Sequence, residues 1–151
     1  MRYDGIFDEL RHQLAARYGE PILAAVMVHR SPDQPRGGTR LRTNNHLALT
    51  PTALRLCGLG GRTGVKLKGD LAAWDRRTAT VEAYDAERAT WFNTTMSHDD
   101  YAVHSLRING PEGTIVVDVM AENPFMDPAA EIRTLLAELA AASPTHPGTP
   151  V

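Results

Sequence analysis

The chain has 151 residues, of which 42% are hydrophobic, and this size suits one domain with one hydrophobic core. Its net charge of −2 and its pI near 6.3 argue against nucleic-acid binding, which needs a basic surface. The single cysteine, Cys57, excludes an intramolecular disulfide and a cysteine-only zinc site. No apolar run reaches the roughly 18–20 residues of a membrane span. We therefore expect a cytoplasmic protein.

The first part of the chain predicts one helix and then one buried strand. Apolar residues recur at helical spacing over residues 3–18, and Gly19 and Pro21 then stop the helix. Residues 22–29 form a continuous apolar run with the length of a buried strand. Residues 30–42 contain two prolines, two glycines and an aspartate, which predicts a loop.

The middle of the chain predicts a run of short strands, because apolar and polar residues alternate there. Pro51 and Thr52 mark a tight turn between two strands, and a glycine-rich connection follows at residues 58–64. The last two strands form a hairpin around a turn at residues 109–113. The segments with a strand pattern are residues 46–50, 53–59, 65–68, 71–75, 78–84, 90–96, 101–108 and 114–120.

A second helix is predicted near the C-terminus. Asp127 can cap its first turn, and Pro128 suits the first helical position. Residues 143–151 contain three prolines and predict a disordered tail, which leaves residues 1–142 as one globular domain. The apolar stripe of the helix is made by Ile132, Leu135, Leu136 and Leu139.

The stretch HLALTPTALRL, from His46 to Leu56, resembles bacterial pleckstrin-homology-like domains. The later Leu106-Arg-Ile-Asn-Gly hairpin, the valine-rich strand after it and the closing helix are similar too, so the resemblance covers about residues 22–142. It implies an α+β fold: a small bent-sheet barrel of about seven strands, with an N-terminal helix and a C-terminal amphipathic helix that closes the barrel. The N-terminal helix, the loop at residues 30–42 and the segment Asp85-Ala-Glu-Arg88 depart from the minimal family pattern.

Charge is segregated along the chain. Residues 30–68 hold eight basic residues and one acid, whereas residues 69–151 hold five basic residues and thirteen acids. In the implied barrel, the connections at residues 30–42 and 58–68 open at the same end, where related domains often place an anionic head group, and the planar fork of arginine suits phosphate. The alternative is a solvated basic surface that balances the acidic half. The candidate anion-binding residues are Arg36, Arg40, Arg42, Arg62, Lys66 and Lys68.

Two other patterns have a chemical and a structural interpretation. The glycines of residues 58–64 could hold a phosphate through backbone N–H groups, but no Gly-Lys-Ser/Thr follows and the next element is a strand, which favours a mobile hairpin loop. Cys57 could act as a nucleophile with His46 as its base, but a lone cysteine in a strand is typical of a core residue. We therefore predict no catalytic residue.

A group of metal-binding side chains occurs at His98-Asp99-Asp100 and His104. No second cluster completes a site, which favours a polar loop that enters a strand. We therefore predict no metal and no cofactor.

The function that these patterns favour is a non-catalytic binding or adaptor module. Its partner would be a protein or an anionic, phosphorylated ligand such as a lipid head group, since the resemblance implies a scaffold and not an activity. One alternative is a self-assembling structural protein, a homodimer for example, in which the N-terminal helix or a strand edge pairs with a second copy. The other is a small α+β enzyme with a polar pocket.

Overall fold

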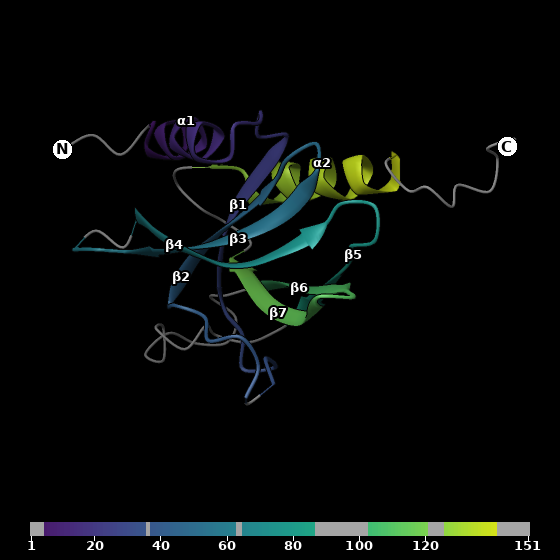
Figure 1. The fold of residues 1–151 in the computed structure, drawn as a ribbon. Helices are drawn as coiled ribbons and strands as arrows, with labels where there is room; N and C mark the ends of the chain where they lie inside the picture. The colour runs from purple at the N-terminus through teal and green to yellow at the C-terminus, as the bar shows by residue number, and fades with distance from the viewer. Residues whose placement is uncertain (1–4, 36, 63–64, 87–102, 121–125, 142–151) are drawn as a thin grey trace, which may run out of the picture.

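The computed structural model describes residues 5–35, 37–62, 65–86, 103–120 and 126–141. These residues form two helices and seven strands, so the fold is α+β, with one helix before the strands and one after them (Figure 1). The elements are α1 (Ile6–Tyr18), β1 (Ala24–Arg30), β2 (Asn44–Leu49), β3 (Ala53–Gly60), β4 (Lys66–Asp75), β5 (Thr80–Ala86), β6 (Val103–Gly110), β7 (Gly113–Met120) and α2 (Pro128–Ala141).

All seven strands lie in one antiparallel sheet, in the order β4-β3-β2-β1-β7-β6-β5. The central strand β1 pairs with β2 along six residues. It pairs with β7 only at its end, where His29 lies opposite Asp118 and Arg30 lies opposite Val117. The sheet therefore consists of two well-paired parts, β1–β4 and β5–β7, joined by a short ladder.

The sheet is not closed into the barrel that the sequence analysis predicts. Among the described residues β4 pairs with β3 and β5 pairs with β6, but the two edge strands do not pair with each other. They are joined by a turn in which the Asp75 carboxylate accepts a hydrogen bond from the Arg77 backbone N–H at 2.8 Å. The buried indole of Trp74 donates from Nε1 to the carbonyl oxygen of Gly113 at 3.1 Å. A side chain, and not a backbone ladder, thus connects the β4 edge with the other part of the sheet.

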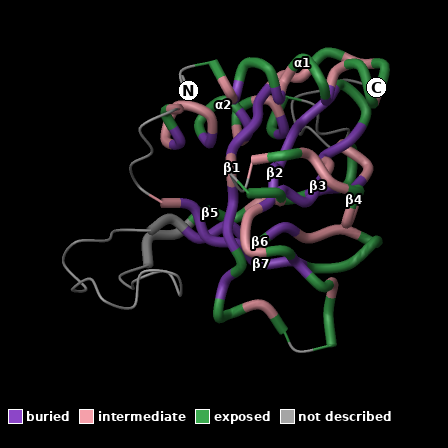
Figure 2. The backbone as a smooth tube through the Cα atoms, turned by 90° about the vertical axis from the view of Figure 1, so that its left-hand side faces the viewer, coloured by how far each residue is buried: buried purple, intermediate pink, exposed green. Residues whose placement is uncertain are grey.

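The main hydrophobic core lies between one face of the sheet and α2. Because side chains alternate along a strand, Val26 of β1 and Leu56 of β3 face this core, whereas Ala25 and Cys57 face the other way. The buried residues run mainly through β1, β2, β3 and β7, and the outer sides of the helices are exposed (Figure 2).

The C-terminal helix α2 begins and packs as predicted. The Asp127 carboxylate accepts a hydrogen bond from the Ala130 backbone N–H at 3.1 Å, which is the predicted N-terminal cap. Leu136 is partly buried at the edge of the core. The buried members of the predicted stripe are Ile132, Leu135 and Leu139.

The N-terminal helix α1 covers the opposite face of the sheet. Its residues Phe7, Leu10 and Leu14 are buried, and Leu14 packs with Ala25 and Ala48. These two alanines are small enough to let the helix approach the sheet closely. The sheet is therefore covered on both faces, and the helix that departs from the minimal family pattern belongs to the packed body of this protein.

Several predicted boundaries differ from the structure. The predicted strands at residues 65–68 and 71–75 are one strand, β4, because irregularities in the β3–β4 register on either side of Cys57 let the pairing continue. The last hairpin turns at Pro111 and Glu112, not over residues 109–113. The predicted strand at residues 90–96 and the predicted tail at 143–151 lie outside the described residues. Neither α1 nor α2 is long and apolar enough to cross a membrane.

Candidate functional site

Two connections that carry predicted basic residues leave the sheet at the same ends of their strands. Asn44, the first residue of β2, lies opposite Leu59 near the end of β3. The β1–β2 connection and the β3–β4 hairpin therefore start at one end of the sheet, although they extend in different directions (Figure 1). The predicted basic side chains consequently divide into two groups.

Arg42 and Lys68 meet over the backbone of Gly60. If Gly60 carried a Cβ, that atom would lie 2.8 Å from Lys68 Cε and 2.9 Å from Arg42 Nη2. The Arg42 side chain also crosses Gly58, where an added Cβ would lie 2.4 Å from Arg42 Cδ. The two glycines thus leave the space in which these basic side chains lie.

Two more predicted residues lie beside this pair. Lys66 packs the start of its side chain against Gly61, and Arg62 is exposed in the hairpin. Arg42 donates from Nε to the carbonyl oxygen of Leu59 at 3.1 Å, which orients the guanidinium. Within the part of the chain that the structure describes, none of these basic side chains forms an ion pair with a carboxylate. We call the four residues Arg42, Arg62, Lys66 and Lys68 the β3 basic surface.

Arg40 lies apart from this surface, in a cavity formed by the β1–β2 connection. The cavity has a volume of about 500 Å³, and Arg30 and Gln34 also line it. Gln34 Oε1 accepts a hydrogen bond from the backbone N–H of Val116 at 2.7 Å, which anchors the connection to β7. Arg36, the remaining predicted residue, lies outside the described residues. Four of the six predicted residues therefore share one region of the structure.

Cys57 does not form a nucleophile–base pair with His46. The two residues lie opposite each other in the β2–β3 register, but neither ring nitrogen of His46 has a hydrogen-bond partner in the part of the chain that the structure describes. The Cys57 thiol donates to the carbonyl oxygen of Lys68 at 3.1 Å and accepts from Arg17 Nη1 at 3.1 Å. Burial raises the pKa of the Cys57 thiol, although the charge of Arg17 acts in the opposite direction. These contacts describe a buried structural thiol.

A row of polar side chains, of which three are buried and Asn44 is partly buried, crosses four neighbouring strands. His29 Nδ1 lies 2.9 Å from Asn44 Oδ1, and Ser105 Oγ donates to Asp118 Oδ1 at 2.7 Å. Burial lowers the pKa of His29, and its hydrogen bond with Asn44 and the charge of Asp118 oppose this shift. The sequence analysis missed this row. The available signal was a single carboxylate inside the apolar run of β7.

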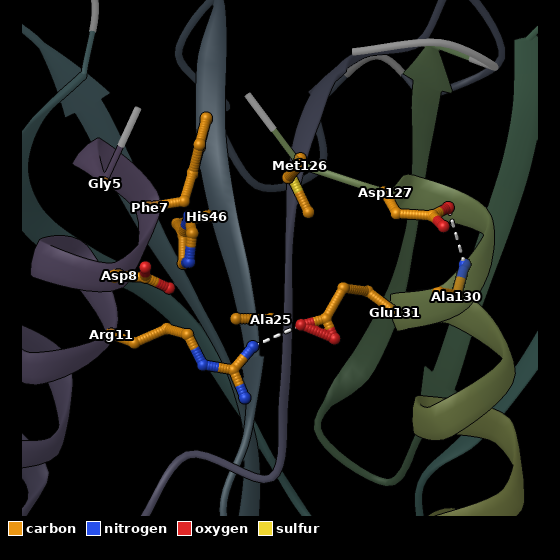
Figure 3. A pocket seen from close by; sticks show the side chains of 10 residues that line it. All are labelled: Gly5, Phe7, Asp8, Arg11, Ala25, His46, Met126, Asp127, Ala130 and Glu131. Atoms are coloured by element: carbon orange, nitrogen blue, oxygen red, sulfur yellow. Dashed lines mark hydrogen bonds and ion pairs between the residues drawn. The ribbon is translucent and has the colours of Figure 1, made fainter. Parts of the chain in front are cut away.

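A second candidate site lies between the two helices, and we call it the interhelical pocket (Figure 3). It has a volume of about 260 Å³ and is lined by α1, β1, β2, the start of α2 and the residues just before it. Arg11 of α1 forms an ion pair with Glu131 of α2 at this pocket. Its lining residues come from distant parts of the chain, so no sequence pattern indicates it.

His46 lies in the wall of the interhelical pocket. Its side chain is only 1% exposed, and its ring stacks on Phe7 with the ring centroids 6.0 Å apart. Burial, and to a smaller extent the charge of Arg11, lower the pKa of His46 to about 4. The imidazole is therefore neutral at pH 7, and it has one donor and one acceptor nitrogen without partners.

The described residues contain no group of three or more histidine, cysteine, aspartate or glutamate side chains placed to hold a metal ion. The predicted group at His98-Asp99-Asp100 lies outside the described residues, as does the side chain of His104. No model of a known protein family matches the sequence, and no curated protein matches it. A function therefore has to be argued from the chemistry of the two candidate sites.

Proposed function

We propose that the protein is a non-catalytic binding module that recognises a phosphorylated ligand through the β3 basic surface, on a pleckstrin-homology-like scaffold. The observation that carries the proposal is that Arg42 and Lys68 meet over Gly60 without a carboxylate partner among the described residues. The scaffold is supported by the element order, because seven antiparallel strands followed by a packed helix are what the sequence resemblance implies.

The local charge favours an anion with more than one negative charge. Two like charges about 4 Å apart repel each other by roughly 1–4 kcal/mol at the dielectric of water or of a protein surface. A phosphate monoester carries about −1.5 to −2 charges at pH 7, so one phosphate can balance both Arg42 and Lys68. A carboxylate can balance only one of them.

The hydrogen-bonding groups also suit a phosphate. Arg42 donates its Nε hydrogen to the carbonyl oxygen of Leu59, so its two terminal nitrogens can donate to a ligand. A guanidinium can donate two parallel hydrogen bonds to phosphate oxygens, whereas Lys68 acts as a point charge beside it. Arg62 and Lys66 add positive charge at the hairpin and favour the approach of an anion.

One of the two arguments for a self-assembling protein is weakened by the structure. This argument was motivated by the N-terminal helix, which is an addition to the minimal barrel, but Phe7, Leu10 and Leu14 of α1 are buried against the protein's own sheet. The β3 basic surface, by contrast, has no carboxylate partner among the described residues. A binding module is therefore the better supported proposal.

The proposal can be tested by titrating the protein with inositol hexakisphosphate, with a phosphoserine peptide and with vesicles that contain phosphorylated phosphoinositides. We expect saturable binding to at least one probe, with amide chemical-shift changes at β3 and β4. The soluble head group, the peptide and the vesicles share the phosphate chemistry and differ in its source. Binding to none of the three would overturn the proposal.

Three variants separate a specific site from a general charge effect. Arg42→Gln with Lys68→Gln is expected to weaken binding by at least about tenfold, which corresponds to 1.4 kcal/mol. Arg77→Gln with Arg133→Gln makes the same change in net charge at exposed positions elsewhere, and we expect less than about twofold weakening. Gly60→Ala keeps every charge but pushes Arg42 and Lys68 apart, so it should weaken binding with little effect on folding. Equal weakening of binding by both double variants would contradict a specific site and would favour the alternative of a solvated basic surface.

A further inference from the structure

The interhelical pocket is independent of the β3 basic surface and has the size of a small-molecule site. Its volume of about 260 Å³ is slightly below the roughly 300–1,000 Å³ of pockets that hold drug-sized ligands. At roughly 30 Å³ for each water, about nine waters would occupy the same volume. The pocket can therefore accept a compact molecule with one ring or a short chain.

The wall of this pocket contains a buried polar side chain that has no hydrogen-bond partner among the described residues. More than roughly nine in ten buried polar groups in proteins make a hydrogen bond, because an unsatisfied one loses its hydration without compensation. Both ring nitrogens of His46 are exceptions to this rule, and His46 lines the pocket. A ligand that enters the pocket can supply the missing hydrogen bond.

Carboxylates outnumber basic groups around the pocket. Asp8, Asp127 and Glu131 line it, and Arg11 is the basic residue among its lining residues. Glu131 is paired with Arg11, and Asp127 caps α2. The Asp8 carboxylate, in contrast, makes no hydrogen bond or ion pair with any residue that the structure describes.

Apolar groups complete the site. Asp8 and His46 lie on the α1 side of the pocket in Figure 3, and Met126 and Glu131 lie on the α2 side. Phe7 stacks on the histidine ring, so the polar edge of His46 is set beside an aromatic surface. A ligand with a cationic end and a small apolar body would match this arrangement.

We propose that the interhelical pocket binds a small organic amine in its ammonium form. The ammonium group donates a hydrogen bond to the acceptor nitrogen of His46 and pairs with the Asp8 carboxylate. Its apolar part lies against Phe7 and Met126. An anion of the same size would face the excess of carboxylates.

The neutral state of His46 agrees with this assignment. Because its pKa is about 4, the imidazole keeps an acceptor nitrogen at pH 7 and does not repel a cation. The remaining charged groups that face the pocket are Asp8, Arg11, Asp127 and Glu131.

Three probes of similar size and different charge test the proposal. Benzylammonium is the cation, benzyl alcohol is neutral and benzoate is the anion. We expect benzylammonium to shift the imidazole ¹⁵N resonances of His46 in a saturable way, and the other two probes to bind at least about tenfold more weakly. Absence of a saturable shift with benzylammonium, or equal binding of benzoate, would overturn the proposal.

Two neighbouring acids of α1 provide a matched pair of variants. Asp8→Asn and Glu9→Gln each remove one negative charge from the first turn of the helix, so their effects on the helix dipole are alike. Only Asp8 lines the pocket. Asp8→Asn is expected to weaken benzylammonium binding by at least about tenfold, and Glu9→Gln by less than about twofold. Equal effects of the two variants would contradict a direct role of Asp8.

His46→Phe separates a ligand-binding role from a structural one. Phenylalanine can keep the stacking on Phe7, and it removes the two unpartnered nitrogens. We expect loss of benzylammonium binding together with a Tm about 2–4 °C higher than that of the wild-type protein. If the variant does not fold, the Asp8→Asn and Glu9→Gln comparison still decides the proposal.

Discussion

The guanidinium of Arg11, on α1, forms an ion pair with the carboxylate of Glu131, on α2. The two residues lie 120 positions apart in the sequence, and their side chains are 31% and 22% exposed. Arg11 also donates from Nη2 to the carbonyl oxygen of Ile22 at 3.2 Å, just before β1. One side chain thus links the N-terminal helix, the segment that leads into the central strand and the C-terminal helix.

This link is expected to contribute measurably to stability. In a double-mutant cycle with Arg11→Met and Glu131→Gln, we expect a coupling free energy of about 1 kcal/mol, because the pair is more shielded than a fully exposed one. Urea unfolding of the four proteins measures it. The more exposed pair between Arg107 and Glu82 serves as a comparison and should give only a few tenths of a kcal/mol. A coupling near zero for Arg11 and Glu131 would contradict the expectation.

His46 should make the protein less stable as the pH falls from about 7 to about 4. The folded protein lowers the pKa of His46 to about 4, whereas an unfolded histidine has a pKa of about 6.5. Between these values the unfolded state binds a proton that the folded state does not bind, so unfolding becomes more favourable. The loss is roughly 3 kcal/mol, and the contribution is fully present above the unfolded pKa.

The variant His46→Phe isolates this effect. We expect the difference in unfolding free energy between wild type and variant to change by roughly 3 kcal/mol between pH 7 and pH 4. Substitution of the exposed His12 by Gln is the control and should leave the pH dependence close to that of the wild type. Parallel pH profiles for the wild type and His46→Phe would show that His46 is not held neutral by burial.

Local patterns explain why most elements could be predicted from the sequence. The N-terminal cap of α2 depends on Asp127 and on the backbone of Ala130, three residues away. In β7, alternate residues such as Val117 and Val119 face the main core, which is the spacing of a strand. Both features are contained in fewer than ten consecutive residues, so spacing alone indicates them.

Features that depend on distant packing could not be predicted in the same way. Closure of the sheet depends on whether the edge strands β4 and β5 pair with each other. They do not, and Trp74 instead connects β4 with Gly113 of β7. The covering of the second face depends on the docking of α1. The interhelical pocket exists only because Arg11 of α1 then reaches Glu131 near the start of α2. The sequence indicated the excess of basic residues at 30–68. It did not indicate that Arg40 lines the cavity of the β1–β2 connection whereas Arg42 lies over β3, because this depends on the fold of that connection.

The close packing of Gly110 against Trp74 gives a prediction for stability. A Cβ added at Gly110 would lie 2.9 Å from Trp74 Cδ1 and 2.7 Å from Glu112 Oε1. The indole is buried and is held by its bond to Gly113, so it cannot move away without loss of packing. Gly110→Ala is therefore expected to destabilise the protein by about 1–3 kcal/mol in urea unfolding.

Gly69 in β4 provides the matched control for this substitution. An added Cβ at Gly69 would have no atom within 4 Å, and its backbone does not need a positive φ. Gly69→Ala is expected to change stability by less than about 1 kcal/mol, and toward greater stability, because alanine restricts the unfolded chain. Equal losses in the two variants would show that the contact with Trp74 is not the cause.

The buried thiol of Cys57 should react slowly with alkylating reagents in the folded protein. Its side chain is 1% exposed, and burial raises the pKa of the thiol, so both access and the fraction of reactive thiolate are low. At pH 8 we expect alkylation by iodoacetamide to be at least about tenfold slower in the native protein than in urea, as measured by mass spectrometry. Equal rates would mean that Arg17 activates the thiol more strongly than burial suppresses it, and the assignment of Cys57 as a structural residue would then be wrong.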